Sequence, residues 1–265
     1  MVCISPRRLN DVSVPCSKCA ACNYNYRRGW QSRLEMESKL YDSDHQAFVT
    51  LTYSEVPLTP DFQPTLRKSD LQKFFKRCRK DKYIIRYLAV GEYGDKGGRP
   101  HYHAIIFGPT VQEIQRMCSD HWPHGHNLVV PVLEGATSYV AKYIVKQSDH
   151  DLGTYPLEGS PFMLSSRRPG IGVIGLKEMG ERYKHDPTYQ ILENTGDIST
   201  IYRSNGKWRS LPARDARIVR ESAGVPLKAS DRPDKPPREN DAEEIEKAKR
   251  FLSVLEAKKR FYASF

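Results

Sequence analysis

Several features are missing from this sequence. It has no Gly-x-x-x-x-Gly-Lys-Ser/Thr motif, no internal repeat and no apolar run long enough to span a bilayer. These absences exclude a recognisable helicase motor and predict no membrane association. No signal peptide is expected either, because Arg7 and Arg8 interrupt any apolar run near the start. Only six of 265 residues are cysteine, which favours reduced thiols over a secreted disulfide framework.

Charge is what the chain has in excess. It carries 42 basic and 32 acidic residues, a net charge of +10, and 38% of its residues are hydrophobic. That is enough apolar material for one large domain, or for a domain with an appendage. Residues 66–99 alone hold eleven basic and four acidic residues. A polyanionic partner such as nucleic acid would fit this excess, although a solvated helix face would look the same.

Two candidate strands with a glycine-rich connection lie near the middle of the chain. Residues 84–93 and 101–107 are rich in β-branched and aromatic side chains, as strands are. The connection between them has turn chemistry, so we expect an antiparallel hairpin. Side chains alternate across a strand. His101 and His103 are therefore predicted on one face, with Tyr102 on the other.

The hairpin would bring an acid to the histidines. Glu92 ends the first strand, and pairing of the two strands returns it beside His101 and His103. Two imidazoles and one carboxylate form a ligand set for a divalent cation, and Mn²⁺ or Mg²⁺ suits it as well as zinc does. We therefore predict a metal site at these three residues.

A helix is expected at 134–148, after a strand at 127–133. Tyr139 and Tyr143 are four residues apart and so share one helical face. Lys142 and Lys146 flank them. A phenol is a weak nucleophile at neutral pH, and a nearby cation favours its phenolate form. The pattern is what a tyrosine nucleophile needs.

The N-terminal segment contains a cysteine motif. Cys16, Cys19 and Cys22 form Cys-x-x-Cys-x-x-Cys, and Cys3 lies upstream as a fourth thiol. Four thiolates suit a structural Zn²⁺ ion. A cysteine-rich turn with free thiols and an iron–sulfur cluster are the alternatives, and nothing else in the sequence indicates redox chemistry.

Five stretches in this order resemble the HUH endonucleases, the single-strand nickases that start rolling-circle replication. The narrower resemblance is to the replication initiators of gokushovirus-type phages, and together the stretches span about two-thirds of the chain. They are Pro-Cys-x-x-Cys-x-x-Cys (15–22), Phe-Val-Thr-Leu-Thr-Tyr (48–53), Gly-Glu-Tyr-Gly…Gly-Arg-Pro-His-Tyr-His (91–103), Tyr-Val-Ala-Lys-Tyr (139–143) and Ser-Arg-Arg-Pro-Gly-Ile-Gly (166–172).

The resemblance implies a fold and an activity. The family fold is an antiparallel sheet with helices packed on it, and the mixture of strands and helices here also favours an α+β class. The implied activity is cleavage of single-stranded origin DNA by a tyrosine, which leaves a 5′-phosphotyrosine link for later religation. The implied setting is the cytoplasm of a bacterial host, with host helicase and polymerase as further partners.

DNA contacts are expected from basic side chains in three places. These are the helix predicted at 69–81 and capped by Ser69 or Asp70, the hairpin turn, and the loop 165–172. The candidates are Lys73, Lys76, Arg77, Lys80, Arg99, Arg167 and Arg168.

The remaining segments complete the predicted organisation. A cysteine-rich segment and helix occupy 1–46, with the helix at 24–41, Trp30 and Leu34 inward and Arg33 outward. The nickase core covers 47–225, with a first core strand at 47–53, a helix at 110–120 and an Asn205-Gly206 hairpin within 198–211. A proline-rich linker follows at 226–240. An amphipathic helix at 241–265 either packs on the domain or binds a partner.

Two readings compete with the nickase. A non-enzymatic zinc-containing DNA-binding protein would use the tyrosines only for packing, and a transposase or relaxase would share the fold. His121, His124 and His126 resemble a second metal site, but proline and glycine mark that stretch as a loop. We expect those histidines to be incidental.

Overall fold

The computed structural model describes residues 2–9, 12–62, 64–94, 98–132, 159–186, 198–204, 206–225 and 241–263. The predicted helix 134–148 and the predicted linker 226–240 lie outside these ranges. The elements, in chain order, are β1 (Arg7–Leu9), β2 (Val12–Val14), α1 (Ala20–Ser38), η1 (Ser43–His45), β3 (Gln46–Thr52), α2 (Lys68–Lys80), β4 (Arg86–Tyr93), β5 (Pro100–Phe107), α3 (Val111–His121), β6 (Asn127–Pro131), β7 (Phe162–Ser165), α5 (Val173–Lys184), β8 (Ile201–Ser204), β9 (Lys207–Ser210), α7 (Ala213–Ala223) and α8 (Asp241–Ala263).

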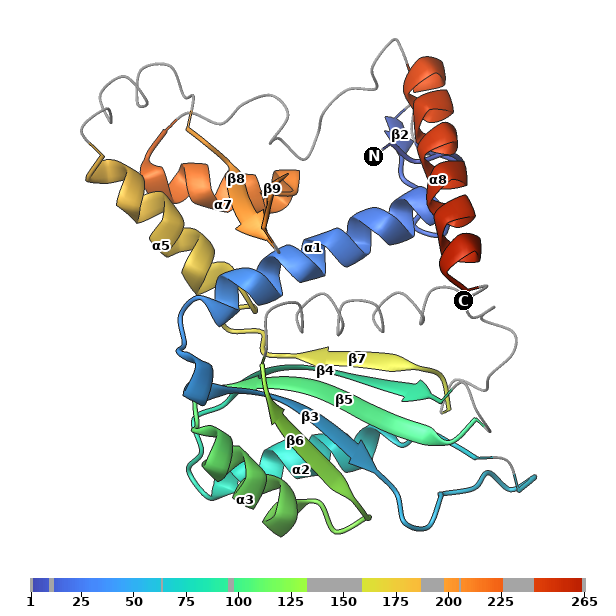
Figure 1. The fold of residues 1–265 in the computed structure, drawn as a ribbon, viewed down its shortest axis with the longest axis vertical. Helices are drawn as coiled ribbons and strands as arrows, with labels where there is room; N and C mark the ends of the chain where they lie inside the picture. Colours follow the sequence, from blue (N-terminus) through green and yellow to red (C-terminus); the bar gives the residue numbers. More distant parts are fainter. Residues whose placement is uncertain are drawn as a thin grey trace.

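A five-stranded sheet forms the centre of the molecule (Figure 1). Its strand order is β6-β3-β5-β4-β7, and each strand runs antiparallel to its neighbours. The predicted hairpin is β4–β5, in which Glu92 pairs with His101 and Tyr93 with Pro100. The α+β class and the antiparallel sheet are therefore confirmed.

One face of the sheet is covered by α2 and α3, which lie below it in Figure 1. β3 and β4 are not neighbours, since β5 lies between them, and the connection through α2 therefore crosses a face of the sheet. Leu71, Phe74 and Phe75 of α2 are buried there against Tyr102 and Ala104 of β5. This cluster is the larger part of the core.

The opposite face of the sheet meets α1. Leu34 packs with Leu88, Val90 and Ile105, whose side chains alternate with those of the first face. Figure 1 shows α1 between the sheet and a second group of elements formed by α5, α7 and the β8–β9 hairpin. Met36, two residues after Leu34, is buried in that second group. Helix α1 thus joins two hydrophobic cores.

The helix ends depart in part from prediction. α3 begins at a capping box, in which Thr110 Oγ1 accepts from the Glu113 N–H at 3.2 Å and the Glu113 carboxylate accepts from the Thr110 N–H at 2.8 Å. The predicted cap of α2 is wrong. α2 starts at Lys68 after Arg67, without a side-chain cap. Asp70 is buried and accepts a hydrogen bond from the Tyr53 hydroxyl at 2.9 Å.

The outer surface of α1 is also more engaged than the sequence suggested. Arg33 was expected to face outward, but its Nη2 pairs with Oδ1 of the buried Asp215 of α7 at 2.9 Å. Ser32 Oγ donates to the same carboxylate at 3.2 Å. A carboxylate buried in this way needs a paired cation and hydrogen bonds, so Arg33 joins α1 to α7.

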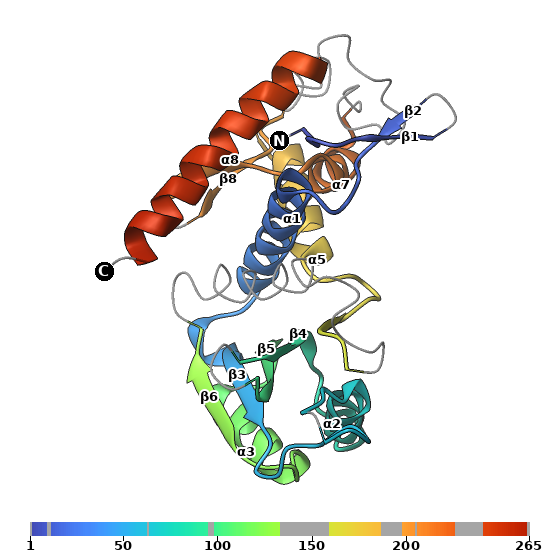
Figure 2. The same ribbon diagram turned by 90° about the vertical axis from the view of Figure 1, so that its right-hand side faces the viewer.

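The C-terminal helix is confirmed as α8. Figure 2 shows it beside the N-terminal end of α1, and Tyr24 and Phe251 are in edge-to-face contact with ring centroids 5.9 Å apart. The predicted Asn205-Gly206 hairpin is also confirmed, as β8–β9. α5 and α7 were not predicted. In the part of the chain that the structure describes, none of the helices is both long and apolar enough to cross a membrane.

Candidate metal and DNA-cleavage site

The β4–β5 hairpin places the three predicted metal ligands on one face of the sheet. Glu92 lies directly opposite His101 across the strand pair, and His103 lies two residues further along β5, opposite Val90. Thr50 of β3 pairs with His103 from the other side. All of these side chains project toward the face that meets α1.

Glu92 and His103 form a buried pair. His103 Nε2 lies 3.2 Å from Glu92 Oε1, and the two residues are 8% and 6% exposed. The second carboxylate oxygen, Oε2, is buried without a hydrogen-bond partner among the residues that the structure describes. Leaving a buried acceptor unpaired costs roughly 1–3 kcal/mol, more when it is charged. A cation at this oxygen would remove that cost.

Two residues of β3 hold the His103 ring. Nδ1 lies 3.0 Å from Thr50 Oγ1, and the Phe48 ring stacks on the imidazole with centroids 5.5 Å apart and planes 16° apart. No site residue was predicted on this strand. The available signal was its alternation, because residues 48 and 50 share a face once β3 pairs with β5.

His101 lies on the same face but stands apart from the other two side chains. Its Nδ1 lies 2.8 Å from the Pro100 carbonyl oxygen, and the two histidine rings are 6.4 Å apart. A Cβ atom at Gly94 would lie 3.1 Å from His101 Nε2. Glycine at 94 therefore leaves room for the ring at the start of the turn.

The three side chains suit a divalent cation. In metal sites, the second imidazole nitrogen commonly hydrogen-bonds to a protein oxygen, which fixes the ring and its tautomer. Nδ1 of both histidines meets such an oxygen, so Nε2 is the atom of each ring suited to coordination. Glu92 and His103 are already paired, whereas His101 would have to turn toward them. The four cysteines of the N-terminal segment are the only group of three or more potential ligands within 4.8 Å in the described ranges.

The predicted nucleophiles fall outside the described residues. This applies to Tyr139 and Tyr143 and to the flanking Lys142 and Lys146. Tyr102, between the two histidines, points to the other face of the sheet as predicted, where its hydroxyl donates to the Arg67 carbonyl at 3.0 Å. Burial raises the pKa of the Tyr102 phenol to about 12. Tyr102 is therefore a structural residue.

The four N-terminal cysteines come together as a cluster. The Sγ atom of Cys3 lies 3.5 Å from that of Cys16 and 3.7 Å from that of Cys19, and Cys16 and Cys22 are 3.9 Å apart. A tetrahedral ion with Zn–S bonds of about 2.3 Å separates its sulfur ligands by about 3.8 Å. A disulfide would need about 2.05 Å. The spacing therefore matches a single metal ion.

Backbone amides support this cluster. The N–H of Cys16 donates to Cys3 Sγ at 3.3 Å, and that of Cys19 donates to Cys16 Sγ at 3.2 Å. Hydrogen bonds from the Lys18 and Cys19 amides lower the pKa of the Cys16 thiol to about 6. Burial acts in the opposite direction on Cys22 and raises its pKa. The chemistry is that of a thiolate ligand set anchored at the start of α1.

The basic face of α2 is not next to the metal ligands. Lys73, Lys76 and Lys80 are exposed, but α2 covers the opposite face of the sheet, so the sequence proximity of 66–99 to the histidine motif does not become proximity in space. Arg77 is occupied in the structure. Its Nε and Nη2 donate to the His121 carbonyl at 3.1 and 2.8 Å and thereby tie α2 to the end of α3.

The other predicted DNA contacts are at the two ends of the hairpin. Arg99 donates to the Tyr53 carbonyl and, at 3.3 Å, to the Ser54 carbonyl, so it ties the turn to the end of β3. Arg167 and Arg168 are exposed. They follow β7 at the Arg86 end of β4, about 20 Å from Glu92 for six residues of strand.

The three loop histidines have separate roles. His121 Nε2 lies 3.0 Å from Asp81 Oδ2, and His124 Nε2 lies 3.9 Å from Asp70 Oδ1. The His126 carbonyl accepts from the Thr52 N–H at 2.9 Å. Gly125 closes this turn at φ +152, and a Cβ atom there would lie 2.2 Å from Ser54 N. The turn therefore needs its glycine for close backbone packing.

Comparisons with known proteins identify the class. Residues 46–148 match the family described as the replication-associated protein ORF2 family. The match begins at the first residue of β3 and includes Glu92, both histidines and the segment with the paired tyrosines. No solved structure matches the chain.

Three curated relatives agree with this class. The chain is 28% identical over 230 residues to the replication-associated protein VP4 of Bdellovibrio phage phiMH2K, covering 74% of this chain and 68% of the relative. It is 30% identical over 204 residues to the replication-associated protein ORF2 of Spiroplasma virus 4, covering 67% and 61%. For the replication-associated protein ORF4 of Chlamydia phage 1 the values are 28%, 51% and 38%. The chain is thus related to these phage replication-associated proteins, and the resemblance seen in its motifs is confirmed.

Proposed function

We propose that this protein is a metal-dependent endonuclease that nicks single-stranded origin DNA and so starts rolling-circle replication of a phage. The observation that carries the proposal is the Glu92–His103 pair, which has an unpartnered buried carboxylate oxygen and His101 on the same sheet face. The names of the relatives support a role in replication. The cleavage chemistry is our inference from the side chains.

The residues divide the work of cleavage. Glu92 and the Nε2 atoms of His101 and His103 would hold Mn²⁺ or Mg²⁺, which when bound supplies Lewis-acid polarisation of the scissile phosphate. Tyr139 or Tyr143 attacks the phosphorus, and the bond from phosphorus to the 3′ oxygen breaks. The phenol loses its proton and the 3′ oxygen gains one, while the DNA 5′ end stays linked to the tyrosine. Lys142 and Lys146 favour the phenolate.

Two tyrosines on one helical face would allow a second reaction. One phenol holds the original 5′ end while the other cuts the newly made strand, and the free 3′ hydroxyl then attacks the first phosphotyrosine. Each exchange replaces one phosphodiester by another, so religation needs no external energy source. This explains why a single tyrosine would not suffice for a full replication round.

The same proposal includes a structural zinc ion at Cys3, Cys16, Cys19 and Cys22. The supporting observation is the tetrahedral sulfur spacing of 3.5–3.9 Å. Cys3 and Cys16 flank the β1–β2 hairpin, and Cys19 and Cys22 belong to the first turn of α1 and the residue before it. The ion would fasten the N-terminal hairpin to α1.

Further partners follow from what a nickase cannot do alone. Because the chain carries no recognisable helicase motif, strand separation and synthesis would depend on the helicase and polymerase of the bacterial host. The reaction would then take place in the host cytoplasm. Arg99, Arg167 and Arg168 are our candidates for phosphate contacts near the hairpin, and the α2 lysines would contact only DNA that wraps the opposite face.

The test is cleavage of end-labelled single-stranded oligonucleotides tiled over the phage genome that carries this gene, with Mn²⁺ or with EDTA, on a denaturing gel. The wild type should cut one oligonucleotide only when metal is present. His101→Ala with His103→Ala should abolish cleavage but leave DNA binding within several-fold, because phosphate contacts elsewhere dominate affinity. Metal-independent cutting, or an active double variant, would reject the site. Binding without any cutting would favour the non-enzymatic alternative.

A further inference from the structure

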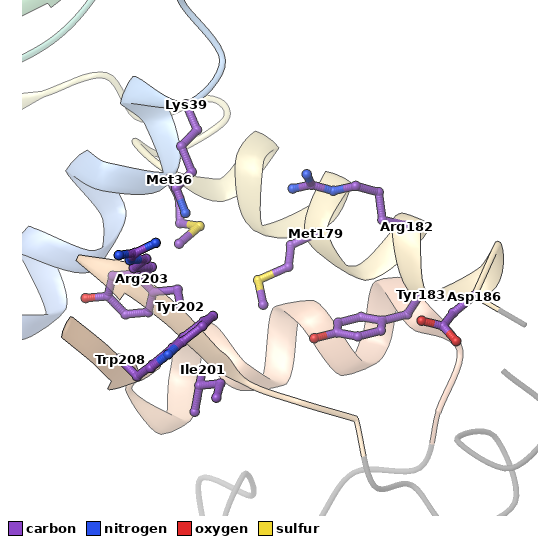
Figure 3. Close-up of a pocket in the computed structure, with 10 residues that line it drawn as sticks. All are labelled: Met36, Lys39, Met179, Arg182, Tyr183, Asp186, Ile201, Tyr202, Arg203 and Trp208. Atoms are coloured by element: carbon purple, nitrogen blue, oxygen red, sulfur yellow. The ribbon is translucent and has the colours of Figure 1, made fainter. Parts of the chain in front are cut away.

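A pocket lies away from the proposed metal site, among α1, α5 and the β8–β9 hairpin (Figure 3). Its volume is about 390 Å³, at the lower end of the range of small-ligand pockets and large enough for one nucleotide. Apolar side chains form part of its lining, contributed by Met36, Met179 and Ile201. The sequence motifs and the proposed cleavage chemistry leave this pocket without a role.

The rim of the pocket is positively charged. Lys39, Arg182 and Arg203 line it together with a single carboxylate, Asp186. Burial lowers the pKa of Lys39, the nearby charge of Arg182 lowers it further, and Glu35 raises it. Two cations held this close at a partly desolvated site favour a bound anion. A phosphate group would satisfy them.

An indole stands open at the same pocket. Trp208 on β9 is 70% exposed although it is the largest side chain of the hairpin, and Figure 3 shows its ring beside Tyr202 and Ile201. The hairpin β8–β9 also carries Arg203, Lys207 and Arg209 and no acidic residue. Exposed aromatic rings set among cations are the arrangement with which proteins bind single-stranded nucleic acid, by stacking on bases and pairing with phosphates.

We propose that this pocket binds one unstacked base of single-stranded DNA against Trp208, with the adjoining phosphates on Lys39, Arg182 and Arg203. The inference rests on the DNA-binding part of the proposed function and adds a recognition site to it. A protein partner fits less well, because three cations face one carboxylate at the rim and interfaces are usually depleted in lysine.

The position of the pocket predicts how the DNA must run. Lys39 follows α1 just before β3, and the first residue of β3 pairs with Phe107, at the end of β5 remote from His101. Six residues of strand correspond to about 20 Å. The base in the pocket would therefore lie several nucleotides from the scissile phosphate, and oligonucleotides too short to span that distance would lose its contribution.

The experiment measures binding of the full-length protein, without added divalent metal, to two fluorescein-labelled probes. One is an oligothymidylate of about 20 nucleotides, long enough to cover a typical single-strand site, and the other is an abasic deoxyribose-phosphate oligomer of the same length. Stacking of one base on an aromatic side chain gives a loss of roughly tenfold when the ring is removed. We expect Trp208→Ala to weaken thymidylate binding by about that factor and to leave abasic binding almost unchanged, and Trp208→Phe to retain most of the affinity.

A matched pair of charge variants tests the phosphate contacts. Arg203→Gln should reduce the slope of log affinity against log salt by close to one contact. Arg116→Gln, on α3 beyond the opposite face of the sheet, removes the same charge and should leave the slope unchanged. Circular dichroism of each variant checks that it is folded.

The outcomes separate this inference from the proposed function. Equal thymidylate affinity for Trp208→Ala and wild type overturns the inference, and so does an equal loss on the abasic probe. If the wild type nicks its origin in either of those cases, the proposed function stands alone. If the wild type never nicks but binding depends on Trp208 and on bases, the pocket stands and the nuclease proposal fails.

Discussion

Thr50 Oγ1 lies 3.0 Å from Nδ1 of His103, across the β3–β5 pair. A hydrogen bond here fixes the imidazole so that Nε2 faces Glu92. Partners of this kind typically change metal affinity by about 10- to 100-fold when they are removed. Thr50 is thus a positioning residue for the proposed metal site rather than a ligand.

The prediction for Thr50 concerns the metal requirement of cleavage. Thr50→Val keeps the β-branched shape and removes only the hydroxyl, so the Mn²⁺ concentration for half-maximal nicking should rise about 10- to 100-fold. The rate at saturating metal should fall much less. Thr50→Ser retains a hydroxyl and should restore a normal metal requirement. A Thr50→Val protein with the wild-type metal curve would show that the contact has no role.

A second prediction concerns the cysteine cluster. Freshly purified, reduced protein should contain about one zinc per chain that dilute EDTA removes slowly, because binding and folding of such sites are coupled. Cys16→Ser should lose the metal and lower the melting temperature. Cys118→Ala, a buried cysteine of the sheet core, is the control. It should lower stability through lost packing but keep the zinc. Protein without zinc by elemental analysis would leave only the packing role.

A third prediction concerns the tyrosine network beneath the sheet. Tyr102 accepts from the Arg67 N–H at 3.0 Å, and its hydroxyl lies 2.7 Å from that of Tyr53. Tyr102→Phe leaves these buried groups without a partner and should lower the free energy of unfolding by about 1–3 kcal/mol in urea titrations. An unchanged unfolding midpoint would contradict this.

The same network gives the protein an alkaline limit. Burial raises the pKa of Tyr102 to about 12, whereas an unfolded phenol ionises near 10. A raised folded pKa means that this contribution is fully present below about pH 10 and is lost as the pH rises toward about 12. Urea unfolding across this window should show the decline, and it should be smaller in Tyr102→Phe. Parallel curves for the two proteins would contradict the assignment.

A fourth prediction concerns the buried Glu37 of α1. It pairs with Arg86 and accepts from the Gly172 N–H at 2.7 Å, while Arg86 also donates to the Pro169 carbonyl at 3.0 Å. Glu37→Gln leaves a buried guanidinium without its counter-charge, so we expect a loss of about 3–5 kcal/mol in chemical denaturation. Glu181→Gln, which removes an exposed pair with Lys184, should cost less than about 1 kcal/mol. Equal losses in the two variants would contradict the role of Glu37.

The parts of the fold that follow local rules could be predicted from the sequence. Alternation on residues 101–107 and the glycine-rich turn were sufficient to predict the β4–β5 hairpin, and that hairpin places Glu92 opposite His101. α5 was missed because Gly175 and Gly180 lie inside it, and glycine disfavours helices. Added Cβ atoms at these positions would lie 2.2 Å from Met36 O and 2.4 Å from Val219 O. Tertiary packing therefore explains glycines that local propensity reads as a loop.

The missed site residues have the same explanation. α7 buries Asp215 and Arg220 among its apolar residues, so its inner face shows no simple hydrophobic stripe, and the ion pair with Arg33 exists only in three dimensions. Thr50 and the Trp208 pocket likewise depend on which elements become neighbours. The α2 lysines show the converse, since proximity in sequence to the histidine motif ended on the opposite face of the sheet.

Attack by the tyrosines is the central claim, and a covalent adduct tests it directly. The wild type is incubated with a 5′-end-blocked, 3′-labelled origin oligonucleotide and Mn²⁺, and the products are separated on a denaturing protein gel. Label transferred to the protein reports a 5′-phosphotyrosine link. Tyr139→Phe and Tyr143→Phe should each form some adduct, and the double variant should form none, since phenylalanine keeps the ring and removes the attacking hydroxyl. A double variant that still becomes labelled in a Glu92-dependent manner would place the nucleophile elsewhere and contradict the account.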